Sequence, residues 1–126
     1  MKEDTRGLLI IAEDDLKVAK DNYKLNNYVV VTFHCQQSVE KYLKAYLNYK
    51  TGFHPFVNSI TYLIKKCMKL DKDFEYLKDI KANILEEYYI AYMYPTLMKI
   101  TEEDAKESID IAEKVREFIL KKLNIQ

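Results

Sequence analysis

The chain has 126 residues, in which 20 basic side chains balance 20 acidic ones and give a formal net charge of zero. This length suffices for one domain, residues 1–126, whose core needs no disulfide or metal, and the neutrality excludes a global field that attracts nucleic acid or anionic lipid. Two glycines and two prolines leave few turns, so long helices with short connections and an all-α fold are predicted.

Localisation is predicted from what the sequence lacks. No apolar run approaches the roughly 20 residues of a membrane span, and the first residues lack the basic and then apolar order of a signal peptide. Cys35 and Cys67 sit within helical patterns without paired metal spacing, which favours reduced core thiols. We therefore expect a cytoplasmic protein with no membrane segment.

The first helix is predicted from about Asp4 to Tyr23, with Asp4 or Thr5 as its N-cap. Its buried face is marked by residues at helical spacing: Leu8, Leu9, Ala12, Leu16, Ala19 and Tyr23. Residues 24–27 then form a polar connection of the length that joins antiparallel neighbours in a bundle.

The stretch from Tyr28 to Tyr49 contains no glycine or proline and carries two different stripes at helical spacing. One is apolar and predicts the side that faces the core: Cys35, Val39, Tyr42, Leu43, Tyr46 and Leu47. The other, called the polar stripe below, falls at i, i+3, i+4 and i+7: Gln37, Glu40, Lys41 and Lys44. Such a helix serves either one core and a solvated face, or a core and a second groove for a partner or ligand.

Glu40 distinguishes these two interpretations of the polar stripe. On a solvated face, a pair between Glu40 and Lys44 would add about 0.3 kcal/mol. In a groove, we expect Glu40 to be partly buried and paired with Lys41, Lys44 or a group from another helix. The groove is the hypothesis that leads to a function.

A short third helix follows the central one. The second helix is predicted to end by Gly52, because glycine readily adopts the left-handed conformation that terminates helices. The chain is expected to become helical again near Asn58 or Ser59, either of which can act as an N-cap, and to leave this helix near Leu70.

Two more helices complete the prediction. A single fourth helix is expected over residues 74–94, because Pro95 limits its continuation. The last helix follows Thr101, which with Asp104 resembles a capping box in spacing, and it runs nearly to the end of the chain. The chain thus has four long helices and one short helix.

Candidates for catalysis or metal binding are few. His34 and Cys35 are adjacent, while His54 and Cys67 lie in other elements, so zinc-ligand spacing is absent and no metal or cofactor is expected. A Cys nucleophile with a His base can form in space, but a buried thiol and a partly exposed imidazole are favoured. Neither glycine has a second glycine nearby, which excludes a P-loop or Rossmann turn.

Tyrosines crowd the end of the predicted fourth helix: Tyr88, Tyr89, Tyr92 and Tyr94. Such rings can stack on bases, but packing and interface roles are favoured. With Val29, Val30 and Phe33, these tyrosines exceed what one small core needs, so we expect the chain to self-associate.

Two motifs resemble those of the HEPN domain family. They are HCQQSVEKYLKAYL at residues 34–47 and YYIAYMYP at residues 88–95, and the similarity extends over nearly the whole chain. The resemblance implies an up-and-down helical bundle that usually forms a homodimer. It also implies kinship with RNA-cleaving toxins that are paired with small nucleotidyltransferase antitoxins.

The chain departs from the catalytic members of that family. These carry an Arg followed after four to six residues by a His, whereas Arg6 and Arg116 have no such His after them. Met93 occupies the family's Arg position in the tyrosine–proline motif, and methionine provides no charge for a phosphate. No catalytic residue is therefore assigned.

The resemblance assigns ligand or partner binding to residues of both motifs: Gln37, Glu40, Lys41, Lys44, Tyr88, Tyr94 and Pro95. The leading hypothesis is a non-catalytic, dimeric partner of a small nucleotidyltransferase in a toxin–antitoxin-type pair. One alternative is a ribonuclease that uses Lys41, Lys44 or His34. Another is a nucleotide-binding regulator that uses the Lys and Tyr surface, so that nucleotide or RNA remain candidate ligands.

Overall fold

The computed structural model describes residues 1–125, and these residues form helices and connecting turns without a strand. The elements are α1 (Glu3–Lys24), α2 (Tyr28–Thr51), α3 (Ile60–Leu70), the 3-10 turn η1 (Lys72–Phe74), α4 (Glu75–Asp79), α5 (Ile84–Met93) and α6 (Glu102–Lys122). The all-α prediction is confirmed. Within the described residues, no helix combines the length and apolar composition that crossing a membrane requires.

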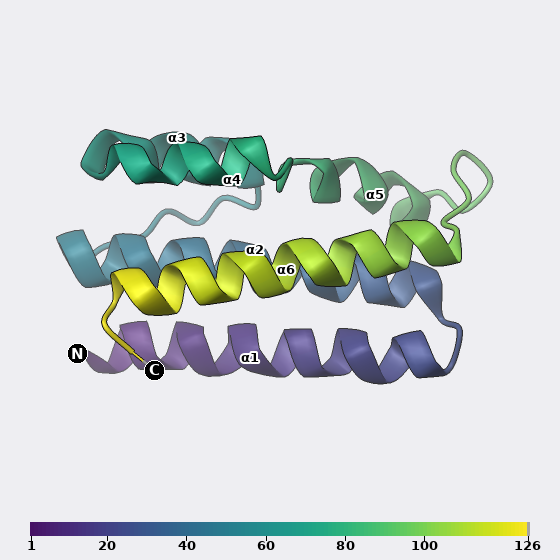
Figure 1. Cartoon of the computed structure of the whole chain (residues 1–126), viewed down its shortest axis with the longest axis horizontal. Helices are drawn as coiled ribbons and strands as arrows, with labels where there is room; N and C mark the ends of the chain where they lie inside the picture. The colour runs from purple at the N-terminus through teal and green to yellow at the C-terminus, as the bar shows by residue number, and fades with distance from the viewer. Residues whose placement is uncertain (126) are drawn as a thin grey trace.

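Helix α2 is the centre of the bundle. It packs against α1, α3, α5 and α6, and in Figure 1 the first of these lies on one side of it while α3 and α5 lie on the other. The predicted apolar stripe is buried along its whole length: Cys35, Val39, Tyr42, Leu43, Tyr46 and Leu47. Because α2 has neighbours on nearly every side, its polar stripe must also meet protein.

Most helix ends follow the predicted signals. Gly52 ends α2 with φ at 80°, and its N–H donates to the carbonyl of Asn48 at 2.8 Å. Ser59 caps α3 by accepting from the backbone N–H of Tyr62 at 3.1 Å. Thr101 and Asp104 form the capping box of α6. These boundaries were therefore predicted from single residues.

The predicted start of the first helix is wrong. Helix α1 begins at Glu3 after Lys2, which makes no side-chain cap, so neither Asp4 nor Thr5 is the N-cap. Thr5 is instead buried within the first turns, where its hydroxyl donates to Asn48 Oδ1 at 2.6 Å. That tertiary hydrogen bond replaces the local cap.

The single helix predicted over residues 74–94 is also divided. A turn at residues 80–83 separates α4 from α5, and Lys81 there has φ at 59°. A continuous helix would carry the face of Leu77 on to Lys81, which is exposed, whereas Ala82 within the turn and Leu85 after it are buried. The turn therefore keeps Lys81 in solvent.

Candidate partner-binding site

The polar stripe lies inside the molecule and is not a solvated face. Glu40 is 0% exposed and Lys44 is 8% exposed, while Gln37 and Lys41 are half-buried. The stripe faces the start of α3, because Lys44 Nζ donates to Oδ1 of Asn58 at 3.5 Å. A solvated face is therefore excluded for Glu40 and Lys44, and Glu40 is fully buried where a partly buried groove was expected.

The predicted ion pairs of Glu40 are absent among the described residues. Lys41 Nζ donates instead to Oε1 of Gln37 at 2.7 Å, and Lys44 extends to the loop before α3. Long lysine stems let the ammonium groups move away from the place where the short carboxylate is held. Glu40 accepts one long hydrogen bond, from Gln36 Nε2 to its Oε1 at 3.4 Å.

Two buried acceptor atoms, on the side chains that this hydrogen bond joins, lack a partner within residues 1–125. They are Oε2 of Glu40 and Oε1 of Gln36. Buried polar atoms are usually paired, so this arrangement costs stability. A protonated carboxyl gains an O–H donor and can donate to a neighbouring acceptor. Gln36 was missed from the sequence, although its position four residues before Glu40 places it on the same face.

Burial raises the pKa of Glu40 to about 7, and the charges of Lys41 and Lys44 partly oppose this rise. Burial also lowers the pKa of Lys44, with Glu40 acting in the opposite direction. The first effect comes from the cost of holding an unpaired carboxylate away from water. The protonation state of Glu40 therefore changes within the physiological pH range.

Glu86 of α5 binds the N-terminus of α3. Its Oε1 accepts from the backbone N–H of Thr61 at 2.7 Å and from the hydroxyl of Ser59 at 3.0 Å. A carboxylate at the N-terminus of α3 is also favoured by the helix dipole. This contact joins α5 to the start of α3, and the negative charge of Glu86 also contributes to the raised pKa of Glu40. The sequence offered no signal for this role.

The tyrosine–proline motif does not join the polar stripe by hydrogen bonds. The hydroxyl of Tyr88, which is buried, donates to Asp104 Oδ1 and Glu107 Oε1 on α6, both at 3.3 Å. Tyr94 follows α5 and is 58% exposed, and Pro95 is exposed as well. The candidate residues of the two motifs therefore lie in separate environments.

An aromatic face lies where α2 meets α5, and it consists of Phe33, Tyr89, Tyr92 and Met93. The Phe33 and Tyr92 rings stack with centroids 4.1 Å apart, and the Phe33 and Tyr89 centroids are 6.2 Å apart. Tyr92 is nevertheless 43% exposed, and Met93 beside it is also exposed. Contiguous apolar surface of this kind marks interaction sites in soluble proteins.

No hydrogen bond joins a cysteine thiol to a histidine imidazole within residues 1–125. Burial raises the pKa values of Cys35 and Cys67, so both remain protonated and are poor nucleophiles. His34 Nδ1 lies 2.9 Å from Oδ1 of Asp15 on α1, with its side chain partly exposed as predicted. Within residues 1–125, no group of three His, Cys, Asp or Glu side chains is arranged to hold a metal.

Comparison with known proteins places this arrangement in a family. The HEPN domain model matches residues 5–123. A protein of Methanocaldococcus jannaschii named "Putative toxin MJ1304" is 34% identical over 122 residues, which cover 86% of this chain and 80% of the relative. No solved structure gives a significant match. The resemblance inferred from the two motifs is confirmed, and the chain belongs to the HEPN domain family.

Proposed function

We propose that this protein is the HEPN member of a toxin–antitoxin-type pair, in which it acts as a non-catalytic homodimer and its partner is a small nucleotidyltransferase. The aromatic face carries the homodimer part of the proposal, because stacked rings with exposed edges suit a protein interface. The name of the archaeal relative supports the toxin-type context. The buried, unpaired cysteines are compatible with work in the cytoplasm.

The proposed lack of catalysis rests on the groups that the two motifs supply. Metal-independent RNA cleavage needs a base, an acid and a fixed cation at the phosphate. Met93 offers no charge, and His34 is held by Asp15 of α1. Lys41 is a mobile cation without the bidentate geometry of Arg, and it already donates to Gln37.

The partnership is tested by searching the gene neighbourhood of this protein for a small nucleotidyltransferase and by co-expressing the two chains. We expect the two chains to elute together in size-exclusion chromatography at micromolar concentration. The Phe33→Glu/Tyr92→Glu variant, with Ile10→Glu as a control on α1, shows whether the pair depends on the aromatic face. Separate elution of the wild-type chains, or a gene neighbourhood without such an enzyme, contradicts the partnership.

Catalysis is tested with purified protein and a mixed RNA substrate at neutral pH. We expect the RNA to remain intact, and Met93→Arg alone to create no cleavage. The matched controls are His34→Ala and the surface variant Lys114→Ala, whose lysine pairs with Asp110 on the exposed side of α6. Cleavage that is lost in the first variant and kept in the second would overturn the non-catalytic assignment.

Glu40 favours one second candidate, a ribonuclease with non-standard residues. A carboxyl whose pKa is raised to about 7 suits general acid–base chemistry, and Lys41 and Lys44 are close enough to influence it. This candidate predicts RNA cleavage that changes around pH 7 and disappears in Glu40→Gln. The related alternative, a nucleotide-binding regulator, predicts saturable ATP binding that Lys41→Ala weakens.

A further inference from the structure

The neutral net charge of the chain conceals a one-sided distribution. Residues 41–70 contain no Asp or Glu and include six lysines: Lys41, Lys44, Lys50, Lys65, Lys66 and Lys69. This segment forms the second half of α2, the loop after it and all of α3. The acidic excess that balances it lies elsewhere in the chain, so this part of the surface has a positive local field.

The fold gathers several of these lysines at one end of the bundle. Helices α2 and α3 both end on the side where the N-terminus lies (Figure 1). Lys50 and Lys69 stand in the last turns of these helices, where they also stabilise the helix dipoles. Within residues 1–125, neither they nor Lys66 form an ion pair, and the nearby Asp71 is already paired with Lys122 at 2.8 Å. Their charges remain available to a partner.

A groove of about 310 Å³ opens between the ends of α2 and α3, and we call it the end groove. Its apolar lining comes from α2, the following loop and α3: Leu47, Phe53, Pro55 and Leu70. Lys66 and Lys69 line the same groove and stand one helical turn apart. Phe53 is 64% exposed although it lines this groove, so apolar surface and positive charge meet at one place.

The tyrosine rings at this end are already covered by cations. Lys66 Nζ lies 5.5 Å from the centre of the Tyr62 ring, and Lys50 Nζ lies 5.9 Å from the centre of the Tyr49 ring. A lysine over one face of each ring leaves less of that ring for stacking on a nucleic-acid base. Together with the apolar lining of the groove, these contacts favour a partner that brings apolar side chains and carboxylates over a single-stranded nucleic acid.

We propose that the end groove binds an acidic, amphipathic segment of a partner protein. Apolar side chains of that segment fill the space lined by Phe53, Pro55 and Leu70, and its carboxylates pair with Lys66 and Lys69. Charge complementarity selects the segment and speeds its encounter, while the apolar contacts hold it. This surface is separate from the aromatic face, so the inference does not depend on self-association.

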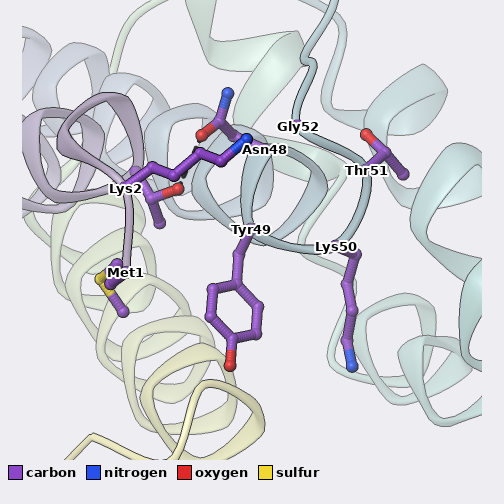
Figure 2. Close-up of a pocket in the computed structure, with 8 residues that line it drawn as sticks. Met1, Lys2, Asn48, Tyr49, Lys50, Thr51 and Gly52 are labelled. Carbon is purple, nitrogen blue, oxygen red and sulfur yellow. Dashed lines mark hydrogen bonds between the residues drawn. The ribbon is translucent and has the colours of Figure 1, made fainter.

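A second cavity extends the positive surface. It has a volume of about 510 Å³ and shares Thr51 with the end groove. Figure 2 shows Lys2 directed toward Asn48 and Gly52 across this cavity, with Lys50 extending away on the far side of Tyr49. An acidic segment that continues past Thr51 meets these two further ammonium groups.

The test uses a displayed library of random dodecapeptides selected on the full-length protein, followed by fluorescence anisotropy of the enriched peptides. Lys66→Glu/Lys69→Glu reverses the charge of the groove. Lys24→Glu/Lys106→Glu is the matched control. Both lysines are exposed and line a cavity between α1 and α6, and Lys24 stands in the last turn of its helix, as Lys69 does. Phe53→Ala tests the apolar lining without changing charge.

We expect enriched peptides that combine several Asp or Glu with bulky apolar residues. Their affinity should fall by about tenfold or more in Lys66→Glu/Lys69→Glu, fall in Phe53→Ala, and stay unchanged in the control. If the Glu variant does not fold, Lys66→Gln/Lys69→Gln takes its place. The proposal would be overturned if no peptide were enriched through the groove, or if the enriched peptides were basic. It would also be overturned if a uridine dodecamer bound more tightly than the peptides and depended on the same lysines.

Discussion

The two sides of α2 both contain fully buried residues, but they differ chemically. The side with Val39 and Leu43 is apolar and packs in the core. The side with Glu40 leaves Oε2 of this residue and Oε1 of Gln36 without hydrogen bonds among the described residues. Burying apolar surface stabilises a fold, whereas burying an unpaired polar group opposes it. Burial alone therefore does not show whether a side of α2 only stabilises the fold. The unpaired atoms indicate that the side with Glu40 is retained for a reason other than stability.

The largest effect is expected on the apolar side. Leu43→Ala removes side-chain atoms from a fully buried position and leaves a cavity. We expect a loss of about 3 kcal/mol in the free energy of unfolding. Urea denaturation followed by circular dichroism measures it. A loss below about 1 kcal/mol would mean that this side of α2 is not the tightly packed one.

A smaller, pH-dependent effect is expected from Glu40→Gln on the polar side. The pKa of Glu40 is about 7 in the folded protein, against roughly 4.3 in an unfolded chain. The folded state therefore binds the extra proton between these values, and wild-type stability from this group is present at low pH and lost as pH rises through 7. We expect the variant to match the wild type near pH 5 and to exceed it by about 2 kcal/mol near pH 8.

The measurement is the difference between the two stability curves, because it removes the contributions of the other carboxylates. Urea unfolding at several pH values provides both curves. Equal differences at low and high pH would show that Glu40 has an ordinary pKa. A Gln variant that is less stable at high pH would instead indicate that the carboxylate is paired with Lys41 or Lys44.

The smallest of these effects concerns Tyr88→Phe. This change removes a hydroxyl that donates to Asp104 and Glu107 at 3.3 Å, a long distance for such bonds. The ring and its packing are kept. We expect a loss of about 0.5 to 1 kcal/mol, measured by thermal unfolding. A loss above about 2 kcal/mol would mean that these hydroxyl hydrogen bonds contribute substantially to the stability of the fold.

The sequence predicts helices where apolar spacing and terminal residues agree. Gly52, Ser59 and Thr101 each carry a local backbone requirement, so their positions as helix ends could be inferred without a structure. The turn after α4 was missed because it contains neither glycine nor proline. Its signal was Lys81, which would lie on the apolar face of a continuous helix.

The site was only partly predictable for a different reason. The spacing of Glu40 and Lys44 placed them on one face of α2, but it could not show which neighbouring helix covers that face. The contact from Glu86 to Thr61 joins residues distant in sequence and depends on how α5 and α3 are both placed against α2. Fully burying Glu40 without an ion pair goes against average behaviour, and departures of this kind are expected at functional positions.

The most direct test of the account is the mass of the protein in solution, because the aromatic face is proposed as the surface through which two copies meet. Light scattering at micromolar concentration should give a mass near twice 15.0 kDa for the wild type and for Ile10→Glu. Phe33→Glu/Tyr92→Glu should give a single 15.0 kDa chain, since it places two like charges in each copy's interface. A wild-type protein that is strictly monomeric, or a double variant that remains dimeric, would contradict the claim.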